Sequence, residues 1–546
     1  MQKNIQSLLV AAINSSLEKL DLRDSAGEEI IIDLPSDNRF GDLSTNIALK
    51  LSRKIKRPPL ELANSIIAGL KSYLKENCLK DYIQEIKTEG PGFINFYLKD
   101  EYFYKQLRDI VKNGSDYFKA DIGGSKKVLI EFVSANPTGS LSVAHARQAA
   151  VGDVLANIFD FCGFSVKREY YLNDEGNQIN ILGNSVELRM KELNGESIDF
   201  PENYYQGDYI YDIAREAKKK KIKSESLGDF AAGYILAIIK EELKDFGVRF
   251  DYWYSQKELG SKGKIEEALD LLKEKGFLYQ KDGALWFNST QFNDDKDRVV
   301  IKSDGAYTYL APDIAYHQDK YKRGFSWLIN LWGPDHHGYI NRLKAAVAAL
   351  GKDQQSLSVI IVQLATIFRA GRPIQMSTRK GQYITLREVL DEVGSDAARF
   401  FFLMRRTNSH LDFDLDVAKK QSSENPVYYV QYAYARISSI LRQTSLEIQV
   451  DKLDFKLLEE KEEIALIKKL LQFSYILNIS IQTLDPYMLT VYLQELAETF
   501  HKFYDQHRVL GQDTELMAAR LALLQATQSL IALGLGLLGI SQPEKM

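Results

Sequence analysis

The sequence predicts an α/β protein whose core is a doubly wound parallel sheet. Residues 128–133 form an almost continuous apolar run, which is typical of a strand covered on both faces. Apolar residues then recur at helical spacing from Val151 to Phe161. Further along, strand-like runs such as SWLINLWG (326–333) alternate with helical stretches. We therefore expect parallel strands with helices on both faces of the sheet.

The chain divides into three expected domains. Residues 1–115 combine helical stretches with the strand-like segment GPGFINFYL, which predicts a small α/β domain. Residues 116–420 carry the parallel sheet, with a more helical and charged insertion at about 180–285. From 421 to 546 strand-like runs disappear and apolar helical patterns continue, which predicts a helical bundle.

Composition narrows the class of protein. A chain of 546 residues with 45% hydrophobic residues has ample material for several cores, which excludes a disordered chain. Cys78 and Cys162 are too few for a disulfide framework, so we expect a reducing, cytoplasmic setting. The apolar run 530–540 is about half of a membrane span, so no membrane anchor is predicted. The net charge of −4 argues against nonspecific coating of nucleic acid but leaves local RNA contacts open.

The segment VLIEFVSANPTGSLSVAHAR (128–147) is the first candidate for chemistry. Glu131 interrupts the buried strand and needs a cationic partner, which is either a protein Arg or Lys or a substrate. A tight turn follows at 137–140, and His145 falls in the first turn of the next helix. Unpaired amides at a helix N-terminus attract phosphate, so His145, with Asn136 before it, is placed to face a triphosphate. An ordinary strand–turn–helix with an internally paired carboxylate is the alternative.

A second group of polar residues follows the strand that ends at Gly333. Asp335, His336 and His337 come directly after it, and the carboxyl ends of parallel strands form the ligand crevice of doubly wound folds. The three residues are also a candidate metal site. Adjacent histidines rarely point the same way, however, and no further ligand stands at zinc spacing, so no protein metal site is predicted.

The third candidate is the glycine-containing segment GRPIQMSTRKG (371–381). It carries Ser377, Thr378, Arg379 and Lys380 in succession. Hydroxyls and cations on such a loop can close over phosphates and neutralise charge that develops during phosphoryl transfer. By itself the segment also fits a basic surface loop.

Taken in order, these three segments resemble the catalytic core of a class I aminoacyl-tRNA synthetase, and their residues are most similar to those of the arginyl-tRNA synthetase family. GPGFINF resembles the end of that family's N-terminal domain, and NPVYYVQYAYARISSIL and the final PEKM resemble its anticodon-binding domain. The resemblance implies a Rossmann-like core, ATP-dependent activation of L-arginine, and transfer to the 3′-terminal ribose of tRNA(Arg). It further implies a monomer in which Mg²⁺ arrives with ATP.

The sequence departs from the family pattern at two places. Where the family usually has His-Val-Gly-His, this chain has Ser142, Val143, Ala144 and His145, so the first histidine and the glycine are missing. Ser142 donates one hydrogen bond but carries no charge, which predicts reduced activity. Where the class has Lys-Met-Ser-Lys-Ser, this chain has QMSTR at 375–379, and many family members share such a replacement.

The resemblance also implies the amino-acid site. A guanidinium has five donors in one plane, so its recognition needs carboxylates around the pocket. Glu131 and Asp313 are the expected carboxylates, with Tyr309 closing over the apolar stem. Ser134 and Asn136 are expected to hold the amino and carboxyl ends. Such a pocket needs no proofreading domain, so the insertion is read as structural or RNA-facing.

The remaining expected contacts are grouped by ligand. The expected catalytic residues are His145, Ser142, Arg379 and Lys380. The expected ATP contacts are Pro137, Gly139, His145, Gly333, Asp335, His336, Met376, Ser377 and Thr378. The expected tRNA contacts are Phe93 and Asn95 for the D-loop, and Tyr429, Tyr432, Arg436 and Met546 for the anticodon loop. Core packing is the alternative for the aromatic residues among them.

Three other functions compete with this reading. A different class I synthetase shares the core motifs. A nucleotidylyltransferase shares the sheet and the histidine element, but it has no reason to carry the C-terminal helices. A catalytically weak or silent tRNA-binding paralogue is motivated by Ser142 and Ala144.

Overall fold

The computed structural model describes residues 5–22, 29–35, 37–76, 78–374 and 383–546. The chain divides into two compact units. The first comprises Met1–Asn113, Leu446–Leu471 and Arg508–Ala526, and the second comprises Gly114–Ser445, Gln472–His507 and Thr527–Met546. The first unit thus takes in two segments of the C-terminal region, which a division by sequence order alone does not anticipate.

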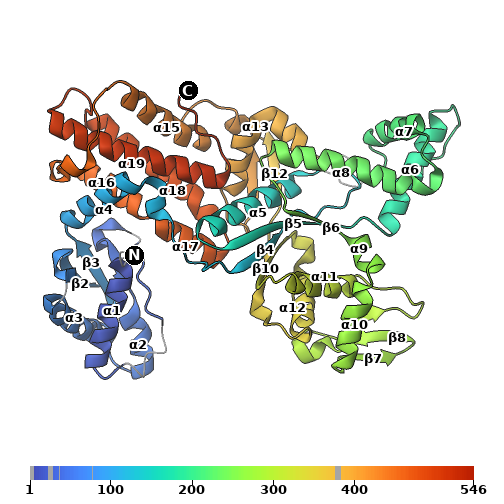
Figure 1. Ribbon diagram of the computed structural model, residues 1–546, viewed down its shortest axis with the longest axis horizontal. Helices are drawn as coiled ribbons and strands as arrows, with labels where there is room; N and C mark the ends of the chain where they lie inside the picture. Colours follow the sequence, from blue (N-terminus) through green and yellow to red (C-terminus); the bar gives the residue numbers. More distant parts are fainter. Residues whose placement is uncertain (1–4, 23–28, 36, 77, 375–382) are drawn as a thin grey trace. The chain divides into compact units, whose positions relative to one another are not determined.

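The first unit contains a small antiparallel sheet with strand order β1-β3-β2. Figure 1 shows this sheet with helices α1 to α3 at the N-terminal, blue end of the chain. Amphipathic helices cover it because residues such as Leu9, Leu51 and Leu70 are fully buried. Its elements are α1 (Ile5–Lys19), β1 (Leu43–Thr45), α2 (Ile47–Ile55), α3 (Pro59–Glu76), β2 (Ile83–Glu89), β3 (Phe93–Leu98), α4 (Asp100–Asn113) and α16 (Lys461–Leu471).

A five-stranded parallel sheet forms the core of the second unit. Its strands are β4 (Lys127–Glu131), β5 (Ser165–Leu172), β6 (Tyr252–Ser255), β10 (Trp327–Trp332) and β11 (Leu357–Ile361). Their order is β11-β10-β4-β5-β6, so the chain winds outward from β4 in one direction and then returns to continue from β10 in the other. This confirms the predicted doubly wound sheet. The switch point lies between β4 and β10, where ligands bind in such folds.

Helix α5 (Val143–Phe161) packs directly on the chain that follows β4. Gly152 permits this approach, because a Cβ atom there would lie only 2.3 Å from the ring of Phe132. The first turn of α5 is therefore held close to the C-terminal end of β4, where the sequence predicts the nucleotide.

The expected insertion at 180–285 is not a single element. Helices α6 (Asn177–Glu192), α7 (Tyr209–Lys220) and α8 (Leu227–Asp245) leave the sheet, but β6 returns to it and pairs in parallel with β5. Three aromatic residues in the short strand YWYS gave no alternating pattern by which to recognise it. After β6 come α9 (Gln256–Ser261), α10 (Lys264–Glu274), and a small antiparallel sheet of β7 (Leu278–Lys281), β8 (Ala284–Phe287) and β9 (Arg298–Ile301).

The remaining elements of this unit complete the core and add helices. Two helices line the face of the sheet near the site, namely α11 (Leu310–Lys322) and α12 (Ile340–Ala349). A further small sheet and its neighbouring helices comprise β12 (Ala365–Arg369), β13 (Arg372–Pro373), α13 (Leu386–Leu403), β14 (Leu411–Asp414) and α14 (Leu415–Ala418). Its last helices are α15 (Pro426–Arg442), α17 (Phe473–Thr483) and α18 (Tyr487–Gln506). Helix α19 (Thr514–Leu538) begins in the first unit and ends in the second. Residues 415–546 are all described and contain no strand, which confirms the predicted helical C-terminal region.

A fully buried arginine, Arg399 on α13, joins the C-terminal helices to the core. Its guanidinium pairs with Asp153 of α5 at 2.6 Å and donates to the carbonyl oxygens of Phe246 and Leu538 at 3.0 and 2.7 Å. A buried guanidinium with three such partners is well satisfied, and removing any of them leaves charge or polar groups unpaired.

Two stretches, Lys461–Thr483 and Thr514–Leu538, are long and apolar enough to cross a membrane by length and composition. The apolar stretch is thus longer than the run 530–540 that the sequence singled out. Core helices of folded proteins pass the same test, and 67% of the apolar window in α19 is buried within the fold. This is weak evidence for a membrane span.

Candidate active site at the switch point

The backbone turns sharply where β4 ends. Val133 and Ser134 both have positive φ values, 67° and 43°, in a region that a β-branched residue such as valine rarely adopts. The turn directs the Ser134 hydroxyl back to the strand, where it donates to Glu131 Oε1 at 3.0 Å. The same hydroxyl accepts a hydrogen bond from the backbone N–H of Tyr171 at 3.1 Å. Such strain clusters at functional sites, where surrounding contacts maintain it.

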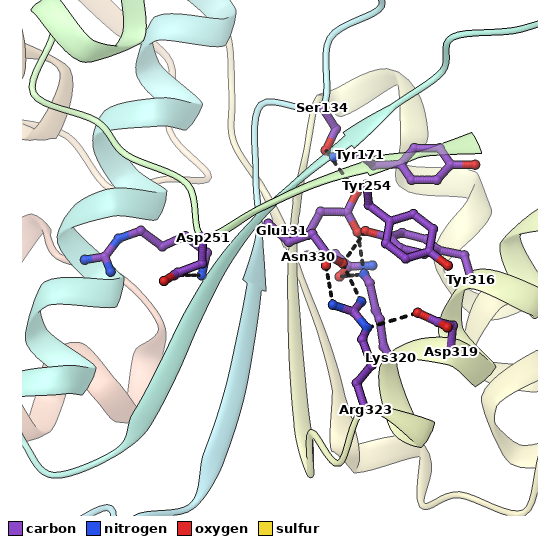
Figure 2. Close-up of polar contacts among 12 residues, drawn as sticks. Glu131, Ser134, Tyr171, Asp251, Tyr254, Tyr316, Asp319, Lys320, Arg323 and Asn330 are labelled. Carbon is purple, nitrogen blue, oxygen red and sulfur yellow. Dashed lines mark hydrogen bonds and ion pairs between the residues drawn. The ribbon is translucent and has the colours of Figure 1, made fainter. Parts of the chain in front are cut away.

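Glu131 has its cationic partner within the protein. Lys320 of α11 is fully buried, and its Nζ lies 2.5 Å from Glu131 Oε2 and 3.2 Å from Asn330 Oδ1 (Figure 2). The sequence had left a protein cation and a substrate as alternatives. The structure selects a protein lysine for one carboxylate oxygen, because a buried unpaired carboxylate is costly.

A second buried ion pair lies beside the first. Glu169 on β5 is the register partner of Glu131, and Arg323 binds it through Nη1 and Nη2 at 2.5 and 2.9 Å. The Tyr316 hydroxyl also donates to Glu169, at 2.6 Å. Helix α11 and the residue that follows it thus supply both cations, Lys320 and Arg323, to neighbouring carboxylates of the sheet (Figure 2).

Asp313 enters the same region from the first turn of α11. Tyr339 donates to its Oδ2 at 2.5 Å. Burial raises the pKa of Asp313 to about 7; the Tyr339 hydrogen bond lowers it, the nearby charge of Glu131 raises it, and Lys320 and Arg342 lower it. Glu131 and Asp313 are therefore close enough to influence each other electrostatically. Burial raises the pKa of the Tyr171 hydroxyl, and the charges of Asp313 and Glu131 raise it further.

Two other residues expected in this pocket are placed differently. Tyr309 is 79% exposed, so its ring does not close over the pocket in this structure. The reason is local: Tyr309 is the N-cap residue of α11 and precedes the buried face of the helix. Asn136 donates through its side-chain amide to Gln178 Oε1 at 2.6 Å, which fixes it at the exposed edge of the site.

The nucleotide side of the site begins with α5. His145 Nδ1 accepts a hydrogen bond from the backbone N–H of Ser142 at 3.2 Å and lies 3.1 Å from its hydroxyl oxygen. Burial lowers the pKa of His145 to about 4, although Asp335 opposes the shift. His145 is therefore neutral at pH 7, with Nε2 left as its donor.

The other expected ATP contacts lie in the turns around the same end of the sheet. Pro137 and Gly139 form the turn before α5, and a Cβ at Gly139 would meet the hydroxyls of Tyr383 and Tyr209 at 3.3 and 3.4 Å. Asp335 and His336 are exposed in the short helix η6 (Pro334–Tyr339) after β10. His336 Nε2 lies 3.4 Å from Asp335 Oδ2. The expected contacts outside the described residues are Met376, Ser377, Thr378, Arg379 and Lys380.

The two residues expected at the D-loop differ in accessibility. Phe93 is 39% exposed at the start of β3. Asn95 is only 2% exposed, and its Oδ1 accepts a hydrogen bond from Ser44 at 2.6 Å. Asn95 is the register partner of Ser44, so its side chain joins β1 to β3 in this structure. It points to the same face of the sheet as Phe93, two residues before it.

Aromatic residues line a cavity of about 400 Å³ between α15 and α18. The expected Tyr429 and Tyr432 belong to it, while the sequence analysis missed Ser423, Tyr428, His501 and Asp505. Tyr428 and Tyr432 stack with their planes 8° apart, and His501 lies 4.8 Å from the Tyr429 ring. The i,i+4 spacing of Tyr428 and Tyr432 was a usable signal, whereas His501 is too distant in sequence to be found that way.

The other two expected anticodon contacts also lie at the surface. Arg436 is exposed with its guanidinium 4.7 Å from the centre of the Tyr504 ring, and Met546 is 49% exposed. The face of α15 that carries the expected tRNA contacts is thus an outer face. The opposite face packs into the core through Val427, Val430 and Ile437.

Comparison with known proteins agrees with this architecture. Residues 5–98 match the arginyl-tRNA synthetase N-terminal domain, residues 106–439 the catalytic domain of class I tRNA synthetases (R), and residues 430–546 the DALR anticodon-binding domain. Arginine–tRNA ligases from Citrifermentans bemidjiense and Geobacillus kaustophilus are 45% and 44% identical to the chain, covering all of it and 100% and 98% of their own lengths.

Solved structures extend the likeness to the fold. The arginyl-tRNA synthetase of Thermus thermophilus superposes with a TM-score of 0.79 at 21% identity, over the full length of both chains. Matching domain models along almost the whole sequence, full-length relatives above 40% identity and a shared fold together establish that this chain belongs to the arginyl-tRNA synthetase family.

Proposed function

We propose that this chain, an arginine–tRNA ligase by family, activates L-arginine with ATP and transfers it to the 3′-terminal ribose of tRNA(Arg). The observation that carries the proposal is the pair of buried carboxylates at the switch point, Glu131 and Asp313. One buried lysine, Lys320, pairs with Glu131 and acts on Asp313 through its charge. Two carboxylates and one ammonium leave one negative charge, which suits a single guanidinium.

The amino acid is bound at the end of β4. Asp313 accepts the guanidinium, and Glu131 provides further acceptor capacity on its lone pairs not used by Lys320 and Ser134. Ser134 and Asn136 lie at the mouth and orient the amino and carboxyl ends. Tyr309, exposed at the start of α11, moves over the apolar stem when arginine binds. A neutral analogue such as citrulline is rejected because it leaves a buried carboxylate unpaired.

Activation is a displacement at the α-phosphorus of ATP by the arginine carboxylate, with pyrophosphate as the leaving group. No protein nucleophile is needed, so the residues act by alignment and by donating hydrogen bonds. His145 donates from Nε2 to a phosphate oxygen, and Gly139 and Gly333 keep the neighbouring turns free of side chains. Mg²⁺, bound to the phosphates, would offset their charge, with Asp335, whose charge acts on His145, as an exposed carboxylate at this edge.

Most of the proposed tRNA contacts are aromatic ring faces. Phe93 in the first unit stacks on a D-loop base, while Tyr429 and Tyr432, with Arg436 and Met546, bind the anticodon loop. We further propose that bound tRNA is required for efficient activation, that the enzyme acts as a monomer, and that it works in the cytoplasm, where its tRNA is found.

The decisive experiment supplies purified protein with ATP, Mg²⁺, labelled arginine and total tRNA. Acid-precipitable label that depends on ATP is the expected result. Binding of tRNA without charging would identify a silent paralogue, and charging with another amino acid would identify a different class I synthetase. Pyrophosphate exchange without tRNA should stay near background.

A further inference from the structure

The arginine pocket is built on a row of buried polar side chains that crosses three strands. Asn330, Glu131 and Glu169 are register partners on β10, β4 and β5, with exposures of 0%, 6% and 0%. Side chains at paired positions of neighbouring strands point to the same face of a sheet. The row therefore faces α11, from which two cations reach it, as Figure 2 shows for Lys320 and Arg323.

Lys320 has so far entered the site only through its charge, and its contacts suggest a second role. Its ammonium has three partners: Glu131, Asn330, and the ring of Tyr316, whose centre is 4.2 Å away. Burying a lysine ammonium costs desolvation free energy, which only well-placed partners offset. Arg323 already pairs Glu169, so Glu131 is the carboxylate that Lys320 pairs.

The position of Lys320 links both carboxylates of the pocket. It follows Asp313 by seven residues, two turns of α11, so the two side chains project from the same face of the helix. Lys320 contacts Glu131 directly and acts on Asp313 through its charge. The Ser134 hydroxyl holds the other oxygen of Glu131, so that carboxylate is fixed from two sides.

We propose that Lys320 is a positioning residue for arginine selection: it fixes the direction of the Glu131 carboxylate and offsets one of the two negative charges of the pocket, so that Asp313 supplies the charge that matches the guanidinium. This inference rests on the proposed function and adds a residue to it. It makes the net charge of the pocket, rather than the number of carboxylates, the quantity that selects arginine.

A double-mutant cycle tests the proposal. Lys320→Met leaves a second buried carboxylate unpaired, and Glu131→Gln leaves the buried ammonium facing Asp313 alone. Each single change is expected to raise the KM for arginine at least tenfold, with the KM for ATP within twofold. The double variant Lys320→Met/Glu131→Gln restores one negative charge, so its arginine KM is expected to be at least fivefold below that of either single variant.

The matched control is Lys264→Met. Lys264 is also an ion-paired lysine near α11, but it binds Asp319 at 2.6 Å and has no contact with Glu131. Its arginine KM should stay within twofold of wild type. Thermal melts followed by circular dichroism establish which variants fold, and should Lys320→Met fail to fold, the comparison of the double variant with Glu131→Gln decides.

The outcomes separate this proposal from the one on which it rests. An arginine KM unchanged in folded Lys320→Met overturns the role of Lys320, as does a double variant whose KM equals the product of the two single effects. A wild-type protein that charges no arginine overturns the proposed function instead.

Discussion

The proposed arginine pocket and the proposed anticodon cavity between α15 and α18 differ in the interactions that they offer a ligand. The pocket holds titratable groups that are buried from water, namely Glu131, Asp313 and Lys320. A ligand that leaves one charge unmatched there loses several kcal/mol of binding free energy, about 3–5. In the cavity, Tyr428 and Tyr432 offer neutral ring faces near the surface, and Tyr432 is 37% exposed. Under the proposed function, the first site selects its ligand by charge and the second by stacking, which is tolerant of small changes.

The difference predicts the largest loss at Asp313. We expect Asp313→Asn to lower kcat/KM for arginine by about 150- to 5,000-fold, since the loss of one partner from a buried charge pair costs about 3–5 kcal/mol. Steady-state aminoacylation measures it, with Asp304→Asn, an exposed aspartate before α11, as the control. A loss below fivefold would show that the carboxylate at 313 is not the partner of the guanidinium.

A mutation in the aromatic cavity should change the KM for tRNA rather than the KM for arginine. Tyr432→Ala is expected to raise the KM for tRNA about 20-fold, because stacking of one base on an aromatic ring is worth about 1–3 kcal/mol. The KM values for arginine and ATP should not change. Tyr434→Ala, two residues further and on the opposite side of α15, serves as control; equal effects of both changes would point to a packing defect instead.

A pH titration sharpens the comparison. Because burial raises the pKa of Asp313 to about 7, this carboxyl is mostly protonated at pH 6 and ionised at pH 8. The guanidinium binds the ionised form, so the arginine KM should fall about tenfold from pH 6 to pH 8. The groups that face Asp313 or interact with its charge are Glu131, Lys320, Arg342, Tyr339 and Tyr171. Asp313→Asn should remove the pH dependence of the arginine KM. A flat profile in the wild type contradicts the assignment.

The smallest expected effect concerns the departure from the family's histidine element. Ser142 is the N-cap residue of α5, and its replacement by Ala should lower the free energy of unfolding by about 1 kcal/mol. The ATP KM should rise about threefold with the loss of one hydroxyl donor. Urea denaturation and ATP titration measure the two effects, and an unchanged midpoint would show that His145 holds the turn without the hydroxyl.

The sequence predicts the doubly wound sheet because its strands carry an apolar pattern that is independent of partners. It predicts Glu131 as a buried carboxylate for the same reason. It does not predict Lys320 as the partner of Glu131, since the two lie 189 residues apart and only the pairing of β10 with β4 and the packing of α11 bring them together. It also does not predict that Asn95 is covered by its pairing with Ser44 of β1, or that Tyr309 is exposed at the N-cap of α11.

The pairing of Arg399 with Asp153 and with the carbonyl of Leu538 ties the end of the last helix to the helix that bears His145. Deletions near the C-terminus are therefore expected to damage amino-acid activation as well as RNA binding. Attempts to obtain a minimal activating fragment by trimming the helical region would remove part of the activating domain's own interior.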